Sequence, residues 1–100
     1  MSYKAVAFEK EGNNWFSVKL LRGNNKEDVF WMDIGVVNGD IQADWNQDTF
    51  STKSYAYSDK RKSGIQKKAY EFEEASSEAT NYLIDKNQIA KNEEGYYIVK

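Results

Sequence analysis

The sequence predicts an α+β fold, in which one C-terminal helix packs on a twisted antiparallel sheet of about five strands, arranged as a meander with a short final strand. Two observations lead to this expectation. Apolar and polar residues alternate through much of the first 45 residues, which is the period of a half-buried strand. Aromatic residues make up 15% of the chain, and large rings suit a pleated surface. With 100 residues, the chain is expected to form a single domain over residues 1–100.

Alternating polarity predicts the first three strands at residues 3–10, 15–21 and 29–37. Polar, glycine-containing stretches at 11–14 and 22–28 are expected to separate them as turns. In the first strand the alternation places Val6 and Phe8 on one face. The core faces of the next two strands are expected to hold Phe16, Val18 and Leu20, and then Phe30, Met32, Ile34 and Val36.

A fourth strand is expected to return after a tight turn at Asn38-Gly39. A type I′ turn needs positive φ at both central residues, and Asn-Gly is the pair that best tolerates this backbone. Ile41, Ala43 and Trp45 then continue the alternation. The first 45 residues are therefore expected to form three or four antiparallel strands.

The middle of the chain is less regular. Residues 46–57 contain Thr, Phe, Ser and Tyr, which favour a further strand. Residues 58–68 are polar and include Gly64, so we expect a loop or a hairpin tip there. Residues 69–72 are compatible with another strand.

A helix is expected over residues 77–90, because Ala79, Tyr82 and Leu83 recur at intervals of three and four. Ser76 or Ser77 is expected to cap its N-terminus by accepting a hydrogen bond from an unpaired backbone N–H group. Gly95 is expected to stop the helix. Residues 96–99 are then expected to form a last strand that pairs back into the sheet.

The chain contains no Cys and no His, which excludes disulfides, zinc fingers, thiol catalysis and every Ser-His or Cys-His mechanism. Its six Gly residues are scattered and form no phosphate-binding loop. No pair of carboxylates has the spacing of a metal site or a glycosidase. We therefore expect a protein that is not an enzyme and that uses neither a cofactor nor a metal.

The sequence also lacks the features of a membrane or secreted protein. No run approaches the ~18 consecutive apolar residues that a spanning helix requires. The first residues open directly into alternation and not into the apolar segment of a secretory signal. These observations predict no membrane partner and a cytoplasmic location, with the oligomeric state left open.

Residues 53–68 form a basic segment, in which six cations stand against Asp59 for a net charge of +5. Single-stranded nucleic acids bind where cations follow the phosphates and exposed rings stack on the bases. This pattern predicts a nucleic-acid contact, to a single strand or a DNA end. An ordinary solvated loop beside half-buried strand tyrosines is the alternative explanation. The candidate residues are Lys53, Tyr55, Tyr57, Lys60, Arg61, Lys62, Lys67 and Lys68.

Residues 69–94 form an acidic segment, in which seven carboxylates stand against Lys86 and Lys91 for a net charge of −5. Two tryptophans, Trp15 and Trp31, fall opposite the core residues of their strands. Either the sheet is covered on both faces, or these rings are presented to a partner. The alternative function is therefore a protein-binding inhibitor or adaptor, of the immunity-protein or phage counter-defence type. It would act through Trp15, Trp31, Glu71, Glu73, Glu74 and Glu78.

A last comparison concerns the stretches NNWFSVKLL at 13–21, WMDIG at 31–35, Glu78-Ala79 and EGYYIV at 94–99. Together they resemble the WGR domain, a tryptophan–glycine–arginine module of some poly-ADP-ribose polymerases and bacterial proteins. The resemblance implies the same order of strands, helix and final strand, and it supports proximity to nucleic acid. When Gly35 is aligned with the family's glycine, Ile34 and Val36 replace its Trp and Arg. The family's DNA-reading residues are therefore not carried over.

Overall fold

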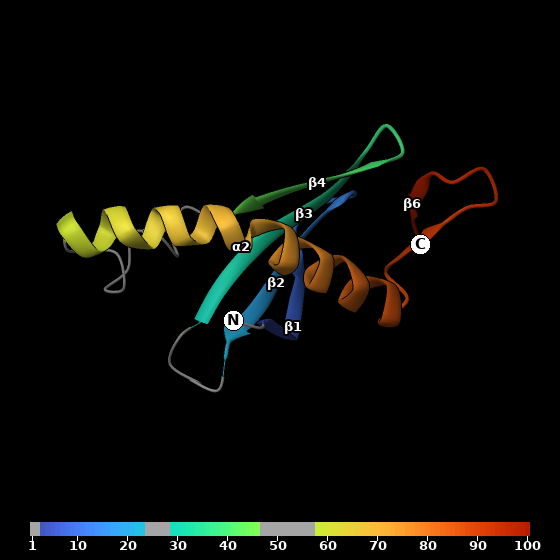
Figure 1. The fold of residues 1–100 in the computed structure, drawn as a ribbon. Coiled ribbons are helices and arrows are strands. Elements are labelled where there is room, and N and C mark those ends of the chain that lie inside the picture. The colour runs from blue at the N-terminus through green and yellow to red at the C-terminus, as the bar shows by residue number, and fades with distance from the viewer. Residues whose placement is uncertain (1–2, 24–28, 47–57) are drawn as a thin grey trace.

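The computed structural model describes residues 3–23, 29–46 and 58–100, with the backbone alone for residues 58–71. Strands β1 (Tyr3–Lys10), β2 (Trp15–Arg22), β3 (Val29–Val37) and β4 (Asp40–Trp45) form an antiparallel sheet in that order. Helix α2 (Ser58–Asp85) crosses one face of this sheet (Figure 1). Strands β5 (Ile89–Lys91) and β6 (Tyr97–Val99) form a second, two-stranded sheet. The α+β class and the meander are confirmed for these residues, whereas a single sheet of about five strands is not.

The face of the sheet that lies against α2, here called the inner face, holds the core. The register of β2 with β3 sets Phe16 opposite Ile34, and Leu20 opposite Phe30. These side chains, with Val18 and Met32, are fully buried. The alternation in the sequence therefore identified this face correctly.

Aromatic rings provide much of the volume of the core, as expected from the small number of aliphatic residues. The ring of Trp45 on β4 lies 5.9 Å from that of Tyr3 on β1 and 6.0 Å from that of Phe30 on β3. It also contacts Phe72 of α2 edge-on, at 6.3 Å. Each such ring buries about 150–250 Å². This cluster therefore ties the helix to three of the four strands.

Strand β1 contains an irregularity that the sequence pattern did not indicate. Its pairing with β2 shifts between Ala5 and Ala7, which leaves Val6 as an extra residue in the strand. Val6 is consequently 37% exposed, while Tyr3 and Ala5 are buried. The expectation that Val6 and Phe8 share the core face is wrong, because one additional residue reverses the alternation within the strand.

The turn between β3 and β4 forms as predicted. Asn38 and Gly39 have φ values of 52° and 83°, and Val37 pairs with Asp40 on either side of them. Two consecutive positive φ angles are the mark of a type I′ hairpin. The Asn-Gly pair therefore sets the register that buries Trp45.

Helix α2 begins well before its predicted start. Residues 58–68 are helical and not a loop, and residues 69–72 are helical and not a strand. Ser76 and Ser77 lie inside the helix, where the Ser76 hydroxyl donates to the Glu73 carbonyl oxygen at 3.1 Å, and neither residue is an N-cap. Ala75, Ala79 and Leu83 recur every four residues and are fully buried. The small side chains of the two alanines let the helix approach the sheet closely.

The end of α2 is set by Asn87 and not by Gly95. Asn87 has a φ of 62°, the left-handed conformation that ends many helices. Its N–H donates to the Ile84 carbonyl oxygen at 3.0 Å, and the Gln88 N–H donates to that of Leu83 at 2.9 Å. This pair of bonds is a Schellman motif, which satisfies carbonyl groups at the helix terminus. The helix therefore ends five residues short of the predicted boundary.

The final strand is present, but its partner differs from the expected one. β6 pairs with β5, with Ala90 opposite Ile98, and does not join the main sheet as a fifth strand. The reversal at Asn87 directs the chain into β5, and β6 follows after a short turn. Because the loop between these two strands is short, pairing β6 with β5 has a low entropic cost. One backbone bond, from the Tyr97 N–H to the Gly39 carbonyl oxygen at 2.8 Å, links this hairpin to the β3–β4 turn.

Candidate binding site on the outer sheet face

The face of the sheet opposite α2, here called the outer face, is formed by the residues that alternate with the core. Trp15 and Trp31 both lie on it, and both are half-buried. The sequence left open whether these rings are covered or presented to a partner. In the structure neither residue is fully buried, while α2 packs against the inner face.

Trp15 is held in place by its neighbour on β3. Its indole lies directly over Gly35, so that a Cβ atom built at Gly35 would come within 2.6 Å of the ring. The preceding residue fixes the strand: the Asn14 side-chain amide donates to the Val36 carbonyl oxygen at 2.8 Å, and the Val36 N–H donates to the Asn14 carbonyl oxygen at 2.9 Å. Trp15 is therefore positioned by its packing on Gly35 and by the two hydrogen bonds that join the preceding residue, Asn14, to Val36.

Trp31 lies two residues before Asp33 on β3 and directly opposite Lys19 on β2. Since directly opposed side chains have Cβ atoms about 4.5–5.5 Å apart, the Lys19 stem and the Trp31 ring are immediate neighbours. Trp31, Asp33 and Gly35 follow one another along the outer face, and the Trp15 ring covers the last of them. The outer face thus has an indole on each side of one carboxylate.

Asp33 is poorly satisfied in this position. Its Oδ1 atom is buried and has no hydrogen-bond partner. The residues directly opposite it are Ser17 on β2 and Asp44 on β4, so a second carboxylate lies on the adjacent strand. An unsatisfied buried acceptor costs about 1–3 kcal/mol, and like charges placed opposite each other add to this. Asp33 is therefore unfavourable for the fold, and residues of this kind concentrate at functional sites.

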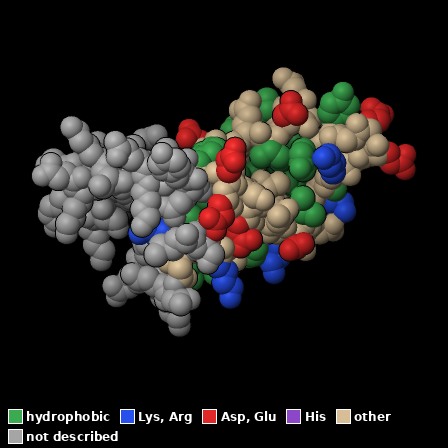
Figure 2. Space-filling model, in the orientation of Figure 1, with side chains coloured by type: hydrophobic (Ala, Val, Ile, Leu, Met, Phe, Trp, Pro, Cys, Tyr) green, Lys and Arg blue, Asp and Glu red, His purple; other side chains and the backbone are tan. Residues whose placement is uncertain are grey.

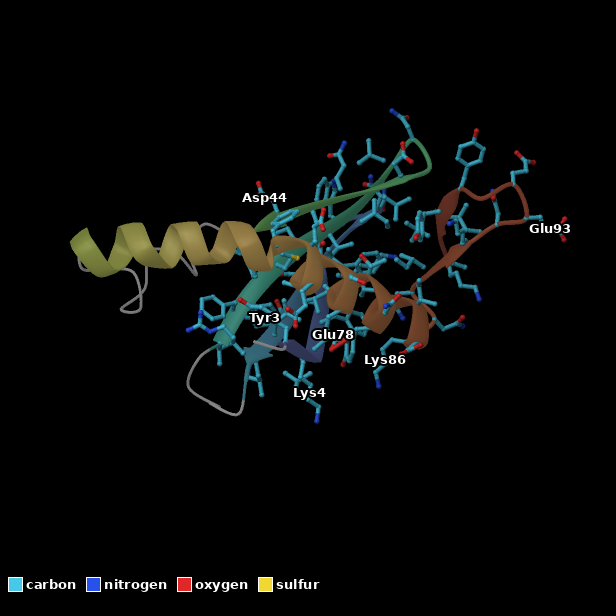
Figure 3. All side chains as sticks on the ribbon, in the orientation of Figure 1. Tyr3, Lys4, Asp44, Glu78, Lys86 and Glu93 are labelled. Atoms are coloured by element: carbon cyan, nitrogen blue, oxygen red, sulfur yellow. The ribbon has the colours of Figure 1, made fainter. Side chains whose placement is uncertain are left out.

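The acidic residues predicted on the C-terminal third do not form one free surface. Glu73 and Glu74 are exposed on α2. Glu78 is partly buried, lies over β1 (Figure 3), and accepts a hydrogen bond from the Ala5 N–H at 3.3 Å through Oε2. The side chain of Glu71 lies outside the described residues. Glu78 therefore connects α2 to the edge strand beside the irregularity in β1.

The predicted basic segment is only partly described. Lys53, Tyr55 and Tyr57 lie outside the described residues, so their candidate role stays a prediction. The remaining candidates belong to the N-terminal half of α2 and not to a loop. Figure 1 shows that this N-terminal half of the helix extends beyond the end of the sheet. These helical positions are Lys60, Arg61, Lys62, Lys67 and Lys68.

Asp33 and Gly35 were not predicted from the sequence as parts of a site. The available signal was the alternation Trp31, Asp33, Gly35, which sets a carboxylate and a glycine on the same face as a tryptophan. The contact of Trp15 with Gly35 depends on the register of two strands, which the alternation within one strand does not specify.

Two statements hold for the part of the chain that the structure describes. No three Asp or Glu side chains there come together in a group that could hold a metal ion. No helix in those ranges has the length and apolar character needed to cross a bilayer. Comparison with family models, with characterised proteins and with solved structures found no match to this chain.

Proposed function

We propose that this protein is a non-catalytic binding module that docks a partner protein on the outer face of its sheet. The observation that carries the proposal is the pair of half-buried indoles, Trp15 and Trp31, on the face opposite the helix. Tryptophan is among the residues most enriched in the energetic centres of protein interfaces. A twisted sheet with rigidly held rings offers a preorganised surface, which lowers the entropic cost of binding.

Asp33 supports a partner that presents a cationic group. Its carboxylate lies between the two indoles along β3, and Asp44 lies beside it on β4. A lysine or arginine from the partner would offset the like-charge repulsion and would stack on an indole ring. The charge arrangement therefore favours a basic docking surface, as expected of a small inhibitor or adaptor.

Affinity capture from cells that express the protein tests this proposal. The wild type is compared with Trp15→Ser and Trp31→Ser, and proteins retained by each are identified by mass spectrometry. Tyr96→Ser is the matched control, because Tyr96 is a 52% exposed aromatic residue outside the outer face. The partner is expected to be lost with both tryptophan variants and kept with the control. Identical retention by all four proteins would contradict the proposal.

A second candidate function is nucleic-acid binding through the basic segment, and the helical backbone of residues 58–68 favours it. Positions 60 and 67, and positions 61 and 68, are separated by seven residues, which is about two turns of an α-helix. The backbone therefore sets four basic positions along one side of a rod. Such spacing suits a run of phosphates.

Fluorescence anisotropy with a labelled single-stranded oligonucleotide tests this second function. Affinity is expected to fall about 10²-fold over a fourfold rise in salt, because several counterions are released on binding. Charge reversal at Lys60, Arg61 and Lys62 is expected to abolish binding. Reversal at Lys86 and Lys91, which lie over the rings of Tyr82 and Tyr97, provides the control. No binding at low salt would remove this function and leave the first.

A further inference from the structure

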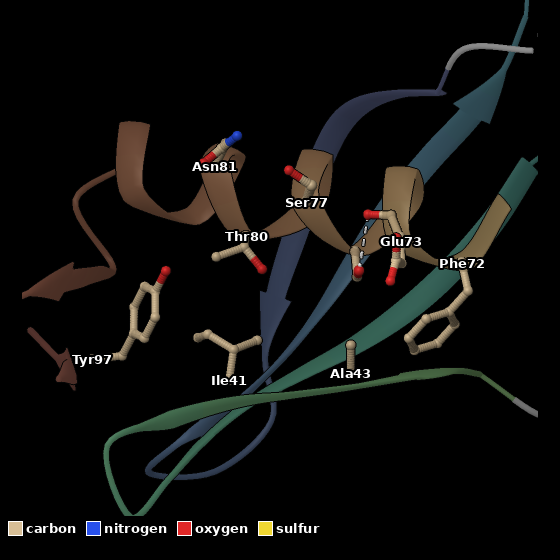
Figure 4. A pocket seen from close by; sticks show the side chains of 9 residues that line it. Ile41, Ala43, Phe72, Glu73, Ser77, Thr80, Asn81 and Tyr97 are labelled. Carbon is tan, nitrogen blue, oxygen red and sulfur yellow. Dashed lines mark hydrogen bonds between the residues drawn. The ribbon is translucent and has the colours of Figure 1, made fainter. Parts of the chain in front are cut away.

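A groove runs between β4 and α2 on the inner side of the sheet (Figure 4). It encloses about 390 Å³. Ile41 and Ala43 of β4 form its floor, and the rings of Phe72 and Tyr97 lie toward its two ends. The wall on the helix side is polar, with the side chains of Ser77, Thr80 and Asn81.

The floor of the groove is the edge of the sheet. β4 is the last strand in the order β1-β2-β3-β4. The Asn46 N–H donates to the Trp31 carbonyl oxygen of β3, so even-numbered residues of β4 direct their backbone groups toward β3. Ile41 and Ala43 therefore direct theirs away from β3, along the outer edge. Among the described residues these two make no backbone hydrogen bond across that edge.

The dimensions match one extended strand. The helix wall runs from Phe72 to Asn81, nine positions further along the helix, or about 13–14 Å at a rise of 1.5 Å per position. An extended peptide rises about 3.3 Å per residue, so about four residues fit along the groove. The apolar floor would take the side chains on one face of such a strand, and the polar wall would contact their flanks.

The charge of the groove indicates the composition of the occupant. Glu73 is the charged residue among those that line it, and it is exposed. Figure 2 shows further acidic side chains gathered along α2 on this side of the molecule. An occupant with a lysine or arginine beside its apolar residues is complementary to this surface.

We propose that this groove binds an extended, basic peptide segment of a partner protein, which adds a strand beside α2 to the edge of β4 that is unpaired among the described residues. Main-chain hydrogen bonds to Ile41 and Ala43 supply affinity, and the contact with Glu73 selects the basic residue. This surface is separate from the outer face, so the inference does not depend on the function proposed above.

Titration followed by ¹⁵N chemical shifts tests the inference. The probe is an acetylated six-residue peptide that alternates valine with threonine and lysine, because strand addition depends mainly on the backbone and tolerates sequence variation. Saturable shifts are expected at the amides of Ile41, Ala43 and Thr80. The same peptide with N-methyl groups on alternate residues is expected to bind at least tenfold more weakly, since it lacks the donors of the new strand.

Matched variants locate the site. Glu73→Gln is expected to weaken the lysine peptide several-fold and to leave a glutamate-containing peptide unaffected or improved. Glu74→Gln, one residue further and outside the groove, is expected to change neither. Ser77→Trp, at an exposed position on the wall, is expected to abolish the shifts while the dispersed spectrum shows that the fold is retained.

Three results would overturn the inference. The first is the absence of saturable shifts at 10 mM peptide, roughly the range of the weakest specific binding. The second is binding that survives Ser77→Trp. The third is a shift of the same amides on raising the protein concentration alone, which would assign the edge to a second copy of this chain. Trp15→Ser is expected to bind the peptide like the wild type, so failure here is distinguishable from failure of docking on the outer face.

Discussion

The indole of Trp15 packs flat against the backbone of Gly35 across the β2–β3 pair, at a distance that leaves no room for a side chain. The φ angle of Gly35 lies outside the left-handed region, so the requirement for glycine here is steric and not conformational. The close approach lets a large ring lie on the outer face without standing far out from it. Trp15 thereby combines a rigid position with partial exposure.

Gly35→Ala is expected to destabilise the protein by about 1–3 kcal/mol, which is typical of overpacking a filled site. The reason is that its Cβ atom would come within 2.6 Å of the Trp15 ring. Urea denaturation followed by far-ultraviolet circular dichroism measures the loss. The same substitution in a Trp15→Ala background provides the control, because the ring is then absent. An equal cost in the two backgrounds would show that the cost arises elsewhere.

Asp33→Thr is expected to stabilise the protein by about 1–2 kcal/mol, because it removes an unsatisfied buried acceptor and suits a strand. Asp44→Thr is the matched control. It relieves the same cross-strand repulsion, but Asp44 is exposed, so its gain is expected to be smaller. Thermal unfolding of the two variants distinguishes the contributions. Equal gains would assign the whole effect to charge repulsion and none to the buried oxygen.

Glu78→Ala is expected to cost about 1 kcal/mol, since it removes the acceptor for the Ala5 N–H on the edge strand. Glu78→Gln, which keeps an oxygen at this position, is expected to retain most of the stability. Glu74→Ala, at an exposed position on the same helix, is expected to stay within about 0.5 kcal/mol of the wild type. Hydrogen exchange at the Ala5 amide gives a local readout, and exchange there that is unchanged by Glu78→Ala would rule out the proposed contact.

Asn87 and Asn81 are expected to respond in opposite ways to glycine and alanine. Asn87 has a left-handed backbone, so Asn87→Ala is expected to be about 1 kcal/mol less stable than Asn87→Gly. Asn81 lies exposed within α2, so there alanine is expected to be the more stable by about 1 kcal/mol. In a domain of this size 1 kcal/mol shifts the melting temperature by about 4–8 °C. The same order at both positions would refute the assigned helix end.

The four strands of the main sheet were predictable because their signals are local. Alternation identified the core residues of β2 and β3, and Asn38-Gly39 fixed the turn to β4. The irregularity at Val6 was not predictable, since the residues of β1 alone do not show where its pairing with β2 shifts. It became visible only through the pairing of β1 with β2.

The predicted helix, residues 77–90, overlaps only the last nine residues of α2, 77–85. Residues 58–71 show no apolar period of 3.6, and Gly64 together with many polar residues resembles a loop. The segment nevertheless contains four lysines, one arginine, one glutamine, one alanine and one glutamate, which are strong helix formers. The C-terminal half, which buries Ala75, Ala79 and Leu83, supplies a formed helix onto which these residues can propagate. Propensity summed over the segment would have been the better guide than polarity.

The candidate site was predictable in its rings but not in its geometry. Alternation placed Trp15 and Trp31 opposite the core, which the structure bears out. The stacking of Trp15 on Gly35 and the unsatisfied oxygen of Asp33 both depend on neighbours from adjacent strands. A single sequence does not specify which residues of two strands face each other, so these features required the register.

The order of elements along the chain also has a consequence during synthesis. All four strands have emerged once Trp45 leaves the ribosome, yet the helical residues that cover them, from Ala75 to Leu83, emerge only 30 to 38 positions later. At a synthesis rate of about 5–20 residues per second, the apolar face of the nascent sheet stays uncovered by α2 for roughly 2–8 s. During that interval Phe16, Leu20, Phe30 and Met32 face water together, and the growing polypeptide is then most prone to capture by chaperones or to aggregation.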